Sequence, residues 1–101
     1  MKRKDYLEIS KKTKLEVWAR DGGKCVVCGN HCAMPNSHVV RRSRGGLGIK
    51  ENVVTHCLKC HMAYDSFDPE IVLKTEKYVR ELYPDWTKEK VTYKKNEKNT
   101  Y

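Results

Sequence analysis

The sequence contains no apolar run approaching the roughly 20 residues that a membrane-spanning helix requires. Its first residues, Met1 to Tyr6, are mostly charged and no apolar segment follows them, so we expect no secretory signal and a cytoplasmic location. The glycines match neither a Walker motif nor a dinucleotide-binding fingerprint, and the chain has no internal repeat. These absences argue against a membrane protein, a secreted disulfide scaffold and a P-loop or dinucleotide-binding fold.

Aromatic residues are also scarce, at 9% of the chain against 34% for charged residues, which predicts a thin core. With 101 residues the chain has room for one small domain, residues 1–101, and a structural metal is a reasonable way to stabilise it. Lys and Arg outnumber Asp and Glu by 21 to 13, a net charge of +8. That excess favours a polyanionic partner, most simply nucleic acid, although a basic and merely soluble surface explains the charge equally well.

Four of the five cysteines form two CxxC pairs, Cys25 with Cys28 and Cys57 with Cys60. Two thiolates three positions apart can hold one Zn²⁺, and two such pairs complete a closed tetrahedral site. Because a reduced, intracellular chain rarely uses such pairs for disulfides, we expect a structural zinc bound by all four.

The remaining sulfur and imidazole groups near these pairs are harder to assign. We expect Cys32 to be a partly buried free thiol and His31 a surface imidazole, because both break the CxxC spacing. His56 is either a structural neighbour of the site or a spare ligand. The run Cys57-Leu58-Lys59-Cys60-His61 is formally a haem-attachment motif too, but that interpretation requires export and leaves the first cysteine pair unexplained.

Local signals predict a small α+β domain. Ser10 or Thr13 can cap a helix that runs to about Arg20, with Leu15, Val17 and Trp18 as its apolar positions. Further along the chain we expect strands at 37–41 and 51–55 joined by a polar glycine loop at 42–50, a helix from Cys57 to about Ser66, and an amphipathic helix that starts at Asp68-Pro69 and ends near Tyr83. Residues 1–9 are expected to be irregular, and residues 86–101 to be frayed, with Trp86 able to fold back.

The ordered motifs in the middle of the chain suggest a family. The run Cys25-x-x-Cys28, Ser37-His38-Val39-Val40, Glu51-Asn52-Val53-Val54, Cys57-x-x-Cys60-His61 resembles the HNH endonucleases of the ββα-metal (His-Me finger) group in their zinc-knuckle form. The likeness covers about residues 12–75, and small phage and prophage proteins of this family are similar to this chain. It implies a hairpin followed by a helix with one catalytic divalent ion between them, flanked by an N-terminal and a C-terminal helix. It also implies double-stranded DNA as substrate, a bacterial host cell as location, and phage packaging proteins as further partners.

The resemblance implies a role for each matching residue. His38 corresponds to the general base that takes a proton from the attacking water. Asn52 corresponds to a residue that either fixes the loop holding the base or helps to hold the metal, and we favour the first role. His61 corresponds to a metal ligand. Asp65 follows His61 by four residues on the same helix face and is placed to be a second ligand, with Asp68 as the fallback.

One position departs from the family pattern. Ser37 stands where family members commonly have a metal-binding Asp or His, and a neutral hydroxyl is a poor ligand beside a carboxylate. We therefore expect Ser37 to contribute weakly or through water. The remaining mixed nitrogen and carboxylate donors suit Mg²⁺ or Mn²⁺, with Ni²⁺ or Zn²⁺ as alternatives. Three arginines follow the base and are expected to contact DNA phosphates, unless they simply belong to a solvated loop: Arg41, Arg42 and Arg44.

These interpretations lead to a metal-dependent hydrolase of DNA that leaves 5′-phosphate and 3′-hydroxyl ends. The main alternative is a non-catalytic zinc module that binds nucleic acid, which explains the charge and the cysteines but not the order of His38, Asn52, His61 and Asp65. A structural or protein-binding zinc domain is a third interpretation, and the basic charge weighs against it.

Overall fold

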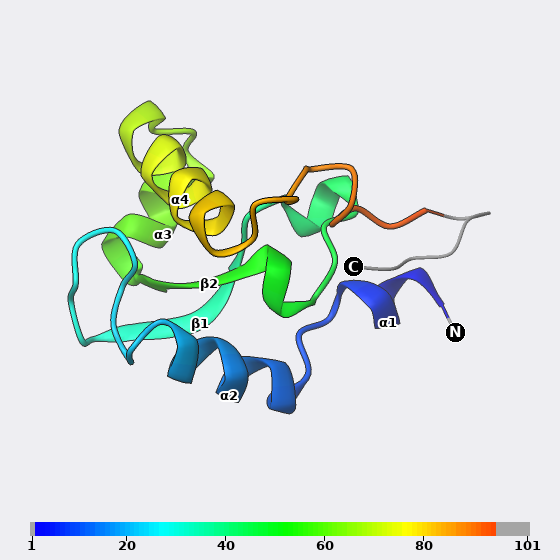
Figure 1. The fold of residues 1–101 in the computed structure, drawn as a ribbon, viewed down its shortest axis with the longest axis horizontal. Coiled ribbons are helices and arrows are strands. Elements are labelled where there is room, and N and C mark those ends of the chain that lie inside the picture. The colour runs from blue at the N-terminus through cyan, green and yellow to red at the C-terminus, as the bar shows by residue number, and fades with distance from the viewer. Residues whose placement is uncertain (1, 95–101) are drawn as a thin grey trace.

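The computed structural model describes residues 2–94, which form a two-stranded antiparallel hairpin with helices on both sides (Figure 1). The α+β class expected from the sequence is therefore confirmed. In chain order the elements are α1 (Arg3–Leu7), α2 (Lys11–Arg20), β1 (Ala33–His38), η1 (Arg42–Arg44), η2 (Lys50–Asn52), β2 (Val53–Cys57), α3 (Leu58–Asp65) and α4 (Pro69–Leu82). Within the described range, none of the helices has the length and apolar content needed to cross a lipid bilayer.

Helices α2, α3 and α4 begin and end where local chemistry predicts. Ser10 caps α2 by accepting a hydrogen bond from the backbone amide of Thr13. Asp68 caps α4 in the same way, and Pro69 occupies its first turn. Cys57 caps α3, which follows β2 without a loop. Of the three apolar positions predicted for α2, Val17 is buried and Trp18 half-buried, but Leu15 is exposed.

The hairpin is displaced from its predicted position. Strand β1 ends at His38 instead of Arg41, and β2 begins at Val53 instead of Glu51. The cause is Asn52. Its backbone carbonyl accepts a hydrogen bond from the amide of Val39, and its side-chain oxygen accepts one from the amide of Val40, so regular strand pairing stops there. All five residues of β2 are buried. Figure 1 shows why, because α2 lies along one side of the hairpin and α3 and α4 along the other.

Two predicted irregular segments are ordered parts of the core. Residues 1–9 contain helix α1, and Leu7 at its end is buried. At the other end of the chain Trp86 is only 2% exposed, and its indole Nε1 donates to the carbonyl of Glu51 at 2.7 Å. The prediction that Trp86 can fold back is therefore confirmed, and the prediction of fraying is wrong as far as residue 94. The rest of that tail, residues 95–101, lies outside the described residues.

The middle of the glycine loop, from Gly45 to Gly48, is buried because two backbone segments approach it closely, while residues 42–44 are exposed. A Cβ on Gly46 would lie 1.7 Å from the carbonyl oxygen of Val40, and one on Gly48 would lie 2.0 Å from that of Glu8. The amide of Leu47, between them, donates to Val91 in the C-terminal segment at 2.8 Å. The loop thus packs against the N-terminal segment at Glu8 and against the C-terminal segment at Val91.

Asp21 connects three elements at the end of α2. Its carboxylate accepts hydrogen bonds from Arg20, from the backbone amide of Thr55 in β2 at 2.9 Å and from the hydroxyl of Tyr78 in α4 at 2.6 Å. The side chain is fully buried, and Arg20 is 16% exposed. Breaking one member of such a buried network leaves the other groups without a partner.

We therefore expect Asp21→Asn to lower the free energy of unfolding by about 3 kcal/mol, because the amide loses the charge opposite Arg20 and turns an NH₂ group toward donors. Denaturant melts would measure it. Glu81→Gln, which removes one partner of an exposed pair with Lys77, is the control and should cost less than about 0.5 kcal/mol. Equal effects of the two substitutions would contradict a structural role for Asp21.

Candidate functional site

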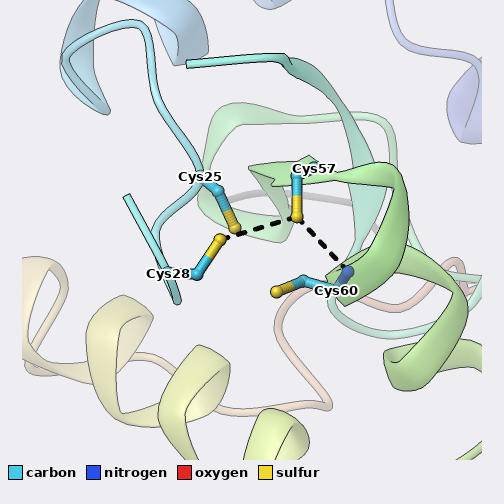
Figure 2. A group of neighbouring side chains, drawn as sticks. All are labelled: Cys25, Cys28, Cys57 and Cys60. Atoms are coloured by element: carbon cyan, nitrogen blue, oxygen red, sulfur yellow. Dashed lines mark hydrogen bonds between the residues drawn. The ribbon is translucent and has the colours of Figure 1, made fainter. Parts of the chain in front are cut away.

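The four paired cysteines converge on one point (Figure 2). Their sulfur atoms all lie within 4.8 Å of one another, and Cys28 Sγ is 3.6 Å from Cys57 Sγ. Zinc–sulfur bonds of about 2.3 Å in a tetrahedron imply sulfur separations near 3.8 Å, so the cluster matches a Cys₄ zinc site in both donor chemistry and size. Within residues 2–94 no other set of three or more His, Cys, Asp or Glu donors is as closely grouped.

Backbone hydrogen bonds shape both halves of the cluster. In the first half, the amide of Gly29 donates to the carbonyl of Cys25, and the amide of Cys25 donates to Asn30, which closes a tight turn. In the second half, the amide of Cys60 donates to Cys57 Sγ at 3.4 Å, so this sulfur also caps α3. Sulfur atoms that accept backbone N–H groups at a helix start are stabilised as thiolates, the form that binds metal.

The thiol pKa values reflect this environment. Burial raises the pKa of Cys25, but hydrogen bonds from the backbones of Cys28, Cys57 and Val27 outweigh it and lower the pKa to about 7. Burial raises the pKa of Cys60, and the neighbouring thiols raise it further. One thiol of the cluster therefore loses its proton easily, and its negative charge opposes deprotonation of the others. A divalent cation would offset this repulsion.

A surface hollow of about 380 Å³ contains three of the predicted catalytic or metal-binding side chains, His38, His61 and Asp65. His38 comes from the end of β1, while the other two lie one turn apart on α3. Arg41 and Arg42 also line this hollow, which we call the reaction pocket.

The ring of His38 is held in one tautomer. Its Nε2 lies 2.8 Å from the carbonyl oxygen of Leu7, which can only accept, so Nε2 carries the proton and Nδ1 keeps its lone pair. Burial lowers the pKa of His38, the Leu7 carbonyl opposes this, and the positive charge of Arg42 lowers the pKa again. At neutral pH the imidazole is therefore neutral, with one nitrogen able to accept a proton.

His61 lies between a hydroxyl and a carboxylate. Its Nδ1 is 2.6 Å from Ser37 Oγ, and its Nε2 is 3.5 Å from Asp65 Oδ2. The serine hydroxyl can accept a hydrogen bond from Nδ1–H, and that tautomer leaves Nε2 available to a cation beside Asp65. Ser37 is 1% exposed and does not line the reaction pocket, so the structure places it behind His61 and not among the open donors.

Asn52 is completely buried and makes three side-chain hydrogen bonds. Oδ1 accepts from the amide of Val40, and Nδ2 donates to the carbonyls of Val40 and Leu47. These are the backbone contacts that the loop-fixing interpretation requires, and they engage both the oxygen and the nitrogen of the side-chain amide. Asp68, the fallback ligand, caps α4 and does not line the reaction pocket.

The three predicted phosphate contacts differ in placement. Arg41 is half-buried, and its guanidinium donates to the backbone carbonyl of Tyr64. Arg42 is exposed, with Glu8 as a distant ion-pair partner at 3.8 Å. Arg44 is exposed and lies over a different hollow from the reaction pocket. Two of the three are therefore close to His38 and one is not.

The unassigned residues also have definite places. His31 is exposed, as expected, but Cys32 is exposed where partial burial was expected, because the loop carries it away from the cluster. His56 is buried, and its Nε2 lies 3.0 Å from Thr75 Oγ1. Burial, and then the charge of His61, lower the pKa of His56 to about 4. It is a structural neighbour that stays neutral, outside the cysteine group.

Sequence reasoning missed the two contacts that orient the pocket imidazoles. The Leu7 carbonyl is a main-chain atom and leaves no residue-type signal, and Ser37 was considered only as a ligand. The sequence held one hint: Ser37 and His38 are consecutive in a predicted strand, so their side chains should point to opposite faces.

Comparisons with protein-family models, with curated proteins and with solved structures each find no match to this chain.

We expect Cys57→Ser to lower the melting temperature by more than about 10 °C, because a structural zinc contributes several kcal/mol to folding. Serine can still cap α3, so the change isolates the metal ligand. Calorimetry and metal analysis would measure the loss, with Cys32→Ser as the matched control. An unchanged melting temperature in Cys57→Ser would show that the cluster holds no structural metal.

Proposed function

We propose that this chain is a metal-dependent endonuclease of the HNH type that hydrolyses DNA phosphodiester bonds, leaving 5′-phosphate and 3′-hydroxyl ends. The observation that carries the proposal is the orientation of His38. A buried carbonyl fixes its proton on Nε2, and the ring shares one basic hollow with His61 and Asp65. A neutral, oriented imidazole with a free nitrogen is what a general base for water requires.

The proposed reaction uses the pocket side chains in distinct roles. His38 Nδ1 accepts a proton from the water that attacks the phosphorus. Arg42, and Arg41 beside it, bind the non-bridging phosphate oxygens. Asn52 keeps the backbone after His38 in place, so the base and the two guanidinium groups keep their relative positions. A divalent ion held by His61 and Asp65, Mg²⁺ or Mn²⁺ by preference, would stabilise the negative charge that develops on the phosphate and the leaving oxygen.

We further propose that the cysteine cluster binds a structural Zn²⁺. Four thiolates with no open position supply no reactive water, so the ion's role is to stabilise the fold. It would fix the start of α3, the helix that carries His61 and Asp65. The grouping of all four sulfurs leaves the haem-attachment alternative without support.

A non-catalytic zinc module that binds nucleic acid is the second candidate. The reaction pocket offers only His61 and Asp65 as adjacent donors within the described chain, and Ser37 is engaged by His61, so a catalytic ion would rely on water for its other ligands. The two candidates share the basic surface and the cysteine cluster. They differ only in whether the protein hydrolyses the DNA that it binds.

Plasmid nicking in the presence of Mg²⁺ or Mn²⁺ separates them. We expect the wild-type protein to nick, and His38→Ala to reduce the rate by about 100-fold or more, because removal of a general base typically costs that much. His31→Ala is the control, since that histidine is exposed and does not line the reaction pocket. A wild-type protein that binds DNA without nicking it under these conditions would favour the second candidate.

The pH dependence of nicking gives an independent measurement. Because the pKa of His38 is lowered, the base is neutral at pH 7 and loses activity only as the pH falls through that lowered value. We therefore expect the acidic limb of kcat/KM to have its midpoint below about 6.5.

Arg42→Gln should move this limb to higher pH, because it removes a positive charge that disfavours protonated His38. Arg44→Gln is the control, and its limb should coincide with that of the wild type. A limb that is insensitive to Arg42 would assign the titration to a group other than His38.

A further inference from the structure

Phe67 has an unusual conformation for a large apolar residue. Its φ is +60°, which makes it the non-glycine residue with a left-handed backbone among residues 2–94. The residue lies in the turn between α3 and α4 and is 60% exposed. A bulky side chain in this region is strained, and exposure of the ring brings no stabilisation from burial. This conformation ends α3 in a Schellman turn, in which the amide of Phe67 donates to the Tyr64 carbonyl and the amide of Asp68 donates to the Ala63 carbonyl. The helix end therefore accounts for the backbone, and the exposed ring is the feature that the fold does not use.

Among the described residues, the ring of Phe67 makes one cation–π contact, with Arg41. The guanidinium carbon of Arg41 lies 3.8 Å from the ring centroid, a close cation–π contact. Arg41 also donates to the backbone carbonyl of Tyr64 and lies 5.2 Å from that residue's ring, so its side chain is held from two directions. Phe67 thus holds an arginine that lines the reaction pocket, while 60% of the residue remains exposed.

Arg41 separates the reaction pocket from a second hollow of about 280 Å³. Phe67 lines this second hollow together with Arg44 and Lys88. Lys88 is paired at 3.7 Å with Glu76, which also lines this hollow, whereas the guanidinium of Arg44 has no ion-pair or hydrogen-bond partner among the described residues. An open aromatic ring beside an unpaired guanidinium combines the two groups that bind single-stranded nucleic acid, a surface for a base and a charge for its phosphate.

We propose that Phe67, Arg41 and Arg44 form a binding site for one unstacked nucleotide next to the scissile phosphate. The base stacks on the solvent-facing side of the Phe67 ring, Arg44 binds the phosphate of that nucleotide, and Arg41 connects the site to the reaction pocket. Because every base has an aromatic face, the site accepts any sequence and prefers single-stranded or frayed DNA over a closed duplex. The position of this site beside a scissile phosphate rests on the proposed function. The binding of a nucleotide to the site does not require the protein to be a nuclease.

The test compares Phe67→Asn with Leu73→Asn in the zinc-loaded full chain. Leu73 is 71% exposed on α4 and lines neither hollow, so it matches the loss of an exposed apolar side chain. Asparagine tolerates a left-handed backbone, so Phe67→Asn should fold with an equal or higher melting temperature. Fluorescence anisotropy with a short labelled single strand, and with a blunt duplex of the same sequence, gives the affinities.

We expect Phe67→Asn to weaken single-strand binding about tenfold relative to Leu73→Asn, and to weaken duplex binding less. Phe67→Trp should restore single-strand affinity, because the larger ring also stacks, and this rescue would not follow from a purely structural role. Arg44→Gln should reduce the salt dependence of single-strand binding by about one counterion. Single-strand affinities of Phe67→Asn and Leu73→Asn that agree within about twofold would overturn the proposal.

Plasmid nicking by the same proteins separates this inference from the proposed function. Absence of nicking by the wild type would reject the nuclease, whereas the anisotropy comparison decides the nucleotide site in either case. Nicking that depends on His38, together with single-strand binding that does not depend on Phe67, would reject the nucleotide site alone.

Discussion

The buried amide of Asn52 is the interaction on which the rest of the site depends. It replaces strand pairing after His38 with side-chain hydrogen bonds to Val40 and Leu47, so β1 ends where the pocket begins. A buried amide is tolerable only when its donors and acceptor are all used, and here they are. The backbone that leads to Arg41 is consequently fixed by a single side chain in place of a regular sheet.

The cysteine cluster and the reaction pocket share one helix. α3 begins with Cys57 and Cys60 in the cluster, and it then presents His61 and Asp65 to the pocket. Because the cap of this helix is a sulfur atom, the charge state of the cluster and the start of the helix are linked. Occupancy of the cluster therefore bears on how firmly the pocket side chains are held, in addition to the stability of the whole domain.

Features with a local cause could be predicted from the sequence. The cap at Ser10, the Asp68-Pro69 helix start and the cysteine spacing each lie within a few residues, and the structure contains all three. The failures have distant causes. Helix α1 is ordered because Leu7 is buried against the rest of the fold, and residues 86–94 are ordered because Trp86 reaches Glu51. Neither contact leaves a periodic signal, since each depends on segments brought together only by folding.

The same distinction applies to the candidate site. The resemblance to the HNH family pointed to His38 and His61, and helical spacing from His61 pointed to Asp65. The structure brings these three residues to one hollow. The tautomer of His38, the Ser37 contact and the Arg41 stack on Phe67 could not, because they depend on backbone oxygens and ring orientations and not on residue types.

Helix α1 has a consequence for how such a protein could be controlled. The oxygen that selects the tautomer of the proposed base belongs to the main chain at Leu7, thirty-one residues before His38, so no side-chain replacement at that position removes it. A segment fused ahead of α1, or a partner that lifts this helix from the hairpin, would free the imidazole to exchange its proton between both nitrogens. Such a change would remove the fixed orientation of the proposed base reversibly, while every residue of the pocket stayed the same.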